Sequence, residues 1–171
     1  MRSCPNFEIV ESTEHHIILK DVGPWDEFKT ITNGVEEVLR SIAMMLIANT
    51  CHRALYYIDS EGECTQIHYA IGEKEVVTNQ PKFLRFSPAT FYVEVLLSWS
   101  KNATLWWREG EDRFTQDVGR AKKFSIKELK PLELDKNQHC KVWFTDYIDT
   151  ITEKTVPTNH EGDHVLLLTK S

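Results

Sequence analysis

The sequence predicts an α+β fold in which a largely antiparallel sheet packs on one long helix. Strand-like segments do not alternate regularly with helical ones, so a series of parallel βαβ units is not expected. Only the segment at about residues 33–48 has apolar side chains at helical spacing over a long run. The chain has 171 residues, of which 41% are hydrophobic. We therefore expect one globular α+β domain spanning residues 1–171.

The first half of the chain contains two predicted hairpins and the long helix. The runs "NFEIVES" and "HHIILKDV" predict two strands, and Gly23-Pro24 then breaks the chain. Thr32 is a predicted helix N-cap. The predicted apolar helix face consists of Val35, Val38, Leu39, Ile42, Met45 and Leu46. In "ALYYIDSEGECTQIHYAI", the residues Asp59 to Gly62 predict the turn of a second hairpin.

The second half is predicted to consist mostly of strands. "TFYVEVLLSW" alternates apolar and polar residues, and "TLWWREG" is expected to run back beside it. In "KFSIKELKP", Ser125 and Glu128 have the spacing of a capping box, and Pro131 keeps that helix short. "KVWFTDYIDTI" and "HVLLLT" are predicted as late strands.

Composition and charge exclude several classes of protein. The net charge is −6 and there is no basic run, so nucleic acid is not an expected partner. No apolar run is long enough to cross a membrane, and no signal peptide is recognisable. Signatures of nucleotide or other cofactor binding are absent, so we expect no cofactor. The cysteines have no metal-site spacing and are expected to be free thiols in the cytoplasm: Cys4, Cys51, Cys64 and Cys140.

One stretch resembles a group of known sequences. "LKDVGPWDEFKTITNGVEEVL" followed by "ALYYIDSEG" resembles small uncharacterised phage and actinobacterial proteins. Those proteins carry a "DVGP…TVTN…VV" stretch and then "LYYYDSEG". The resemblance covers about the first third of the chain. It implies a phage-linked accessory protein in the host cytoplasm and gives no mechanism.

Two adjacent tryptophans supply the predicted binding site. Alternation along a strand places Trp106 and Trp107 on opposite faces. Trp107 is in phase with Leu105 and is expected in the core. Trp106 lies between polar Thr104 and Arg108, so we expect it on the less protected face. Trp106 and Arg108 are therefore candidate contacts with a protein partner or a second copy. The alternative is that the domain buries both rings.

The stretch His160-Glu161-Gly162-Asp163-His164 matches H-E-x-x-H, the core of a zinc hydrolase site. There, His160 and His164 would bind the metal from one face of a helix, and Glu161 would act as general base. A third ligand would have to come from elsewhere, such as His139 or Cys140. Gly162 disfavours the required helix. The alternative is a polar loop that leads into a last core strand, with no metal.

The leading hypothesis is a non-enzymatic, cytoplasmic binding protein with a protein partner or self-association. One alternative is the zinc hydrolase. The other is a small-ligand binding fold, in which Tyr56, Trp99 and Trp143 line the mouth of a curved sheet.

Overall fold

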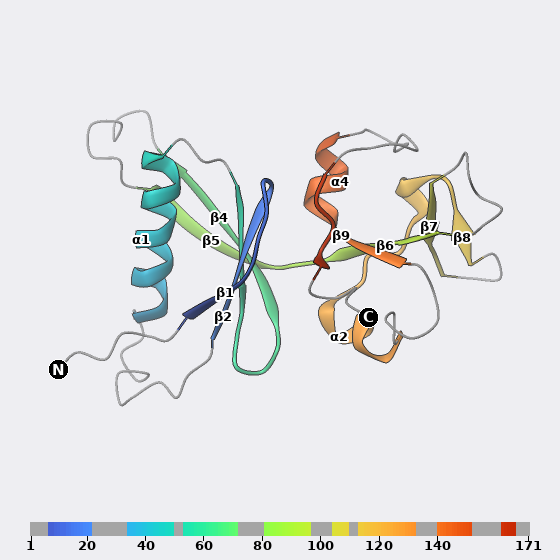
Figure 1. Ribbon diagram of the computed structural model, residues 1–171, viewed down its shortest axis with the longest axis horizontal. Coiled ribbons are helices and arrows are strands. Elements are labelled where there is room, and N and C mark those ends of the chain that lie inside the picture. The colour runs from blue at the N-terminus through green and yellow to red at the C-terminus, as the bar shows by residue number, and fades with distance from the viewer. Residues whose placement is uncertain are drawn as a thin grey trace. The chain divides into compact units, whose positions relative to one another are not determined.

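The structure is a computed structural model that describes residues 7–21, 34–49, 53–71, 81–96, 104–109, 113–132, 140–151 and 162–166. The chain divides into two compact units, Met1–Pro88 and Ala89–Ser171. Each unit has its own sheet (Figure 1). Whether the chain behaves as one folding domain stays a prediction, because a compact unit is not necessarily a domain that folds alone.

The described residues of the first unit form five strands and one long helix. In chain order these elements are β1 (Phe7–Ser12), β2 (His16–Asp21), α1 (Gly34–Ala48), β3 (Ala54–Ile58), β4 (Cys64–Ile71) and β5 (Pro81–Pro88). The strands follow the order β1-β2-β3-β4-β5 across the sheet. Strands β2 and β3 are parallel, and the other neighbouring pairs are antiparallel. The parallel pair arises because the chain crosses over through α1 between β2 and β3.

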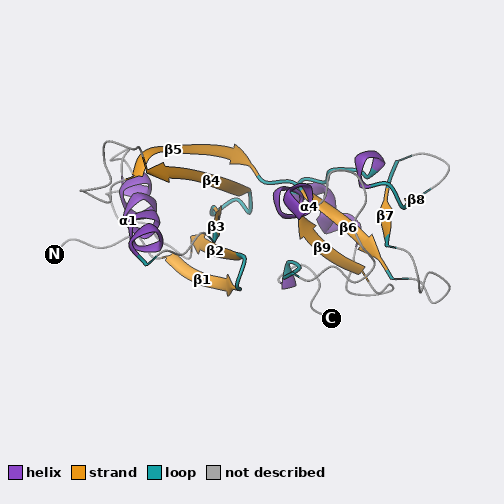
Figure 2. Cartoon of the chain, turned by 90° about the horizontal axis from the view of Figure 1, so that it is seen from above, coloured by secondary structure: helices purple, strands orange, loops and turns teal. Residues whose placement is uncertain are grey.

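The helix α1 covers one face of this sheet, and Figure 2 shows the strands curving around it. Leu39, Ala43 and Leu46 are buried on the side of α1 that meets the sheet, as helical spacing requires. Leu39 and Leu46 form one hydrophobic cluster with side chains of β2, β3 and β4: Ile17, Leu19, Leu55 and Ile67. The predicted position of the long helix is therefore confirmed, but Met45, which was predicted on its apolar face, is exposed.

The two hairpins of this unit have well-defined turns. The Thr13 hydroxyl accepts hydrogen bonds from the backbone N–H groups of His15 and His16 between β1 and β2. Between β3 and β4, an Asp59 carboxylate oxygen accepts from the N–H groups of Glu61 and Glu63. Gly62 has φ 85°, which favours glycine. Both hairpins expected from the sequence are confirmed.

The second unit is built around a smaller antiparallel sheet. Its described elements are β6 (Phe91–Val95), β7 (Leu105–Trp107), β8 (Phe114–Thr115), a 3₁₀ turn (Val118–Arg120), α2 (Ile126–Leu129), a second 3₁₀ turn (Lys130–Leu132), β9 (Cys140–Phe144) and α4 (Thr145–Ile151). The strand order is β8-β7-β6-β9. Every side chain of β6 is buried, so both faces of the sheet are covered at this inner strand. One face carries a cluster of Tyr92, Trp106, Val118, Trp143 and Ile148.

The short helix α2 begins with the predicted capping box. Glu128 N–H donates to the Ser125 hydroxyl oxygen, and Ser125 N–H donates to the Glu128 carboxylate. This reciprocal pair satisfies backbone N–H groups that a helix start leaves unpaired. The helix start expected at Ser125 is therefore confirmed.

The predicted fold class, one sheet packed on one long helix, is wrong. Strands make up 44% and helices 29% of the described residues, and the strands form two separate sheets. Only the first sheet packs on α1. Of the two predicted late strands, the first is confirmed only as far as Phe144, and the described part of the second is not a strand. The strand β9 ends at Phe144 and α4 follows directly. Residues 162–166 form no strand, and residues 167–171 lie outside the described ranges. No helix in the described part of the chain is long and apolar enough to span a bilayer.

Candidate functional site

The side of the first sheet that faces away from α1 is unusually polar. Side chains alternate along a strand, so the neighbours of the residues packed on α1 point to the opposite side. We call this side the polar face. It comprises Glu8, Glu11, His16, Ile18, Lys20, Ala54, Tyr56, Ile58, Cys64, Gln66, His68, Arg85 and Ser87.

Strand pairing aligns one row of these residues across all five strands. Glu11 of β1 pairs with Ile18 of β2, and Ile18 pairs with Tyr56 of β3. Tyr56 pairs with Gln66 of β4, which in turn pairs with Ser87 of β5. Because neighbouring strands lie roughly 4.8 Å apart, Glu11 and Ser87 are separated by about 19 Å.

A β-bulge aims Glu11 at this face. Ile9 pairs with Leu19, and Glu11 pairs with the next residue of β2, Ile18, so Val10 is the extra residue. Without it, strict alternation would place Glu11 on the same side as Ile9, toward α1. The bulge therefore turns a carboxylate from the helix side of the sheet to the polar face.

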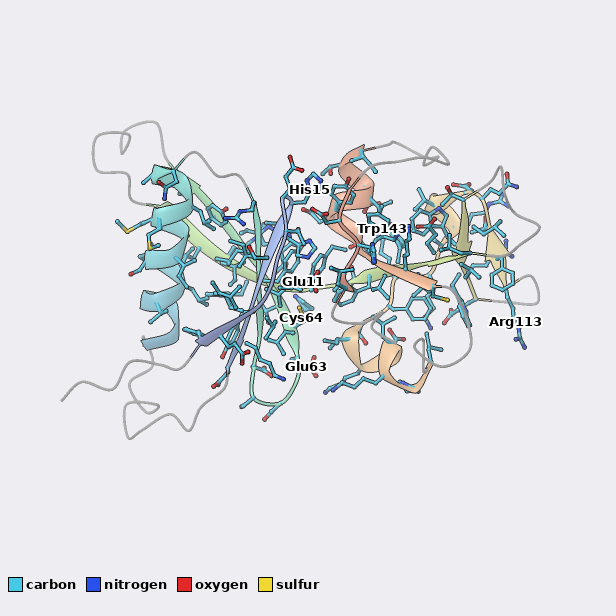
Figure 3. All side chains as sticks on the ribbon, viewed as in Figure 1. Glu11, His15, Glu63, Cys64, Arg113 and Trp143 are labelled. Atoms are coloured by element: carbon cyan, nitrogen blue, oxygen red, sulfur yellow. The ribbon has the colours of Figure 1, made fainter. Side chains whose placement is uncertain are left out.

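Glu11 then meets a buried histidine. The Glu11 Oε1 atom lies 2.7 Å from His16 Nε2, and both side chains are almost completely buried. The ring of Tyr56 meets the imidazole edge-on, with 6.3 Å between the ring centroids. A buried polar group is costly unless it is hydrogen-bonded, and this pairing satisfies both partners. Figure 3 labels Glu11 on β1 and Cys64 on β4, which lies three strands away in the same sheet.

A second imidazole makes a similar contact at the other end of the face. His68 Nε2 lies 2.7 Å from Ser87 Oγ, between β4 and β5. Both side chains are half-buried, and Arg85, directly opposite His68, is exposed. We call Gln66, His68, Arg85 and Ser87 the open end of the polar face, in contrast to the buried end at Glu11 and His16.

The two hydrogen-bonded pairs do not combine into one catalytic triad. A triad needs one imidazole between an acid and a nucleophile. Here Glu11 contacts His16, whereas Ser87 contacts His68, and the two histidines lie on strands two positions apart, at roughly 10 Å. Glu11 is therefore not the acid that orients His68.

The described cysteines are also poor nucleophiles. Burial, together with the nearby Asp59 charge, raises the pKa of the Cys64 thiol from its usual value near 9 to about 12. Burial likewise raises the pKa of Cys140. Since the thiolate is the reactive form, both thiols are unreactive near neutral pH. Both are free and buried.

The predicted orientation of the two tryptophans is wrong. Trp106 has no exposed surface and belongs to the cluster of the second unit with Tyr92. Trp107 is only partly buried and meets Phe114 and Phe124 edge-on. Alternation does separate the two rings, but the sheet is covered on the side of Trp106. The reason for choosing Trp106 as a binding residue is therefore lost.

Arg108, the other predicted binding residue, is half-buried after β7. Its backbone N–H donates to the carbonyl of Arg113, which closes the turn between β7 and β8. Whether Arg108 contacts a partner stays a prediction.

The described part of the H-E-x-x-H stretch is not helical. His160 and Glu161 lie outside the described residues, as does His139. Gly162 has φ 159°, and residues 163–165 have no helical assignment. His164 meets the Trp143 ring edge-on, and Val165 N–H donates to the Val142 carbonyl. Within the described ranges, no three His, Cys, Asp or Glu side chains come close enough together to hold a metal ion. The geometry therefore gives the zinc hydrolase no support.

The predicted ligand site in one curved sheet is also not formed as expected. Tyr56 belongs to the first sheet and Trp143 to the second, and Trp99 lies outside the described residues. Trp143 is instead a structural residue. Its indole N–H donates to buried Glu94 at 2.8 Å, and Tyr147 stacks on its ring.

Sequence reasoning missed the polar face. Neither His16 nor His68 is among the site residues predicted from the sequence. Their partners, Glu11 and Ser87, lie 5 and 19 residues away in sequence, so no short motif joins them. The strand registers that unite them become visible only in the folded sheet.

Comparison with protein-family models, with curated proteins and with solved structures finds no match to this chain. The resemblance to phage and actinobacterial proteins therefore stays a prediction.

Proposed function

We propose that this chain is a non-enzymatic cytoplasmic protein that binds a protein partner through the open end of the polar face. The observation that carries the proposal is the change in burial along this face. Its polar side chains are paired and buried at Glu11 and His16, and they become accessible at His68, Ser87 and Arg85. A rigid strand surface with accessible donors is suited to recognition, because little side-chain freedom is lost on binding.

The chemistry of the described groups favours binding over catalysis. The acid and the serine are held by different histidines, and both described thiols have raised pKa values. Buried free thiols also fit the reducing cytoplasm. The resemblance of the first third of the chain to phage proteins adds a source for the partner, namely a host protein.

Site-specific photo-crosslinking tests this proposal. A diazirine amino acid in place of Gln66 lies within the open end, whereas the same residue in place of exposed Lys127 on α2 lies in the other unit. We expect one protein to be crosslinked in host extract from position 66 and not from position 127. Excess unlabelled chain should compete for it.

Equal crosslinking from both positions, or crosslinking that unlabelled chain does not reduce, would contradict the proposal. Circular dichroism of both labelled proteins controls for misfolding, since Gln66 is half-buried.

A serine hydrolase is a second candidate, favoured by the 2.7 Å contact between His68 Nε2 and Ser87 Oγ. A fluorophosphonate probe labels activated serines. Labelling at Ser87 that is lost in His68→Gln would support this candidate, and an unlabelled Ser87 would exclude it.

A further inference from the structure

We infer that the open end of the polar face recognises a side-chain carboxylate on an acidic segment of its protein partner, with Arg85 as the principal contact. The inference rests on the proposed function and specifies the chemistry of the partner.

Arg85 is the cation available for this contact. It is exposed on β5, and it makes no hydrogen bond or ion pair with any residue that the structure describes. A guanidinium group has five N–H donors and no acceptor, in a planar arrangement that matches both oxygens of a carboxylate. None of these donors is used by a residue within the described ranges.

The neighbouring side chains define a small, ordered surface around Arg85. Arg85 and Ser87 are two residues apart on β5 and so point to the same side. His68 lies directly opposite Arg85 on β4, and Gln66 lies opposite Ser87. Cross-strand and diagonal neighbours of this kind have Cβ atoms about 5 to 8 Å apart. The hydrogen bond between His68 and Ser87 restrains both side chains beside the guanidinium group.

Charge at this surface favours an acidic group. No carboxylate belongs to the open end, and the acids of the same face, Glu8 and Glu11, both lie on β1 at the opposite edge of the sheet. Glu11 lies about 19 Å across the strands, well beyond the roughly 8 Å Debye length at physiological salt. The positive charge of Arg85 is therefore not neutralised within the polar face.

An acidic protein segment fits better than a nucleic acid. Nucleic-acid binding depends on several cations that contact successive phosphates, whereas the open end offers one arginine. A single carboxylate that contacts the open end directly needs only the positive charge of Arg85.

The test is an NMR titration of the full-length ¹⁵N-labelled chain. The probes are a hexaglutamate peptide, a hexaglutamine peptide, inorganic phosphate and an oligothymidine. The readouts are the Arg85 Nε–H and Ser87 backbone N–H signals. Arg85→Gln removes the proposed contact. Arg113→Gln is the matched control, because Arg113 is an exposed arginine in the second unit (Figure 3).

We expect hexaglutamate to give saturable shifts at Arg85 and Ser87, and hexaglutamine to give none. Arg85→Gln should weaken hexaglutamate binding about tenfold, as the loss of a charged hydrogen bond does. Arg113→Gln should change the affinity less than about twofold, because screening leaves little long-range effect. Equal melting temperatures for the variants would show that the loss is local.

Three outcomes would overturn the inference: equal weakening by Arg85→Gln and Arg113→Gln, stronger binding of phosphate or oligothymidine, or no response to hexaglutamate. Repeating the crosslinking from position 66 in the Arg85→Gln background separates this inference from the proposed function. A crosslinked partner that persists unchanged without Arg85 would refute the carboxylate contact and leave the binding function intact. Loss of the crosslinked product in Arg85→Gln would support the contact. If the protein that retains Arg85 gives no crosslinked product either, the binding function itself is refuted.

Discussion

Gly162 lies against an aromatic side chain that leaves no room for a larger residue. A Cβ atom at this position would lie 1.7 Å from the Tyr147 hydroxyl oxygen and 2.2 Å from the ring carbon that carries it. Tyr147 in turn stacks on Trp143, with 5.7 Å between the ring centroids. Trp143 is itself buried and hydrogen-bonded to Glu94. Tyr147 therefore cannot move aside without disturbing the core.

We therefore expect Gly162→Ala to lower the free energy of unfolding by ~1–3 kcal/mol, the usual cost of forcing an extra methyl group into a packed site. Urea denaturation measures this. The control is Gly119→Ala, where the nearest atom is an Asp117 carboxylate oxygen at 3.1 Å, which can shift. In the Tyr147→Ala background, Gly162→Ala should cost much less. An unchanged cost in that background would show that the contact with Tyr147 is not responsible.

At the residue scale, the sequence predicts chemistry well only where the partners are close along the chain. The capping box at Ser125 and Glu128 was predictable, because its three-residue spacing is a local rule. The contact between Glu11 and His16 was not, although these residues are also close. It depends on the bulge at Val10, and no glycine or other turn residue marks that position. The H-E-x-x-H spacing is also a local rule, but it requires a helix, and the described residues 162–164 of that stretch are not helical.

At the scale of elements, each sheet protects its outer strands from pairing with other chains. The edge strand β1 contains a bulge, and the edge strand β5 begins and ends with proline, at Pro81 and Pro88. In the second sheet β8 has only two residues, and Val165 N–H occupies a carbonyl of β9. Short strands, bulges and prolines are common ways to prevent edge-to-edge association. Partner binding through strand addition is therefore disfavoured, in agreement with a binding site on a sheet face.

From the burial of Trp106 and Trp107 we expect the opposite order of stability losses to the one that the sequence predicts. Trp106→Ala should destabilise the fold by ~3–5 kcal/mol, since the ring is fully buried in a cluster with Tyr92. Trp107→Ala should cost less, because that ring is partly exposed. Chemical denaturation of the two variants measures the difference. A larger loss for Trp107→Ala would mean that this face of the second sheet is the better packed one.

Strand periodicity was a good guide to the hairpins and a poor one beyond Phe144. Through β9 the side chains alternate, but α4 follows with Ile148 and Ile151, four and seven residues after Phe144. Short apolar runs fit both the helical and the strand periodicity, so the predicted strand extends beyond its true end. Alternation also gave no information on which side of β7 is the better covered, because that depends on elements distant in sequence.

At the scale of the whole molecule, buried thiol and phenol groups in both units are expected to lower the stability of the fold at alkaline pH. Burial and neighbouring negative charge raise the pKa of Tyr57 and Cys64 in the first unit. Burial and a hydrogen bond to Asp149 raise the pKa of Tyr92 in the second. Below about pH 8 these groups are protonated in both the folded and the unfolded chain, so they contribute no pH dependence.

We therefore expect stability to fall as the pH rises above about 9. Between pH 9 and the Cys64 pKa of about 12, the unfolded chain releases the thiol proton and the folded chain retains it. The unfolded state binds fewer protons, so the free energy of unfolding decreases with pH. Urea denaturation at pH 8, 9, 10 and 11 measures the slope, which should be shallower between pH 9 and 10 in Cys64→Ala. Stability that stays constant to pH 11 would contradict the burial of these groups.

The division into two units could not be predicted from composition. The boundary lies between Pro88 and Ala89, directly between β5 and β6. No glycine-rich, charged or low-complexity linker marks it, and strand-like residues continue on both sides. A single sheet was therefore the simplest expectation, and the true pairing is decided by contacts that lie far apart along the chain.

The contact between Gly162 and Tyr147 has a consequence for the divergence of this sequence. A descendant could acquire a side chain at position 162 only after position 147 had lost its aromatic ring. In the reverse order, the intermediate sequence would carry a side chain at 162 that clashes with Tyr147. The two positions should therefore change together, with glycine accompanying an aromatic residue and a larger residue accompanying a small one. Such paired changes would identify distant relatives in which few other residues are retained.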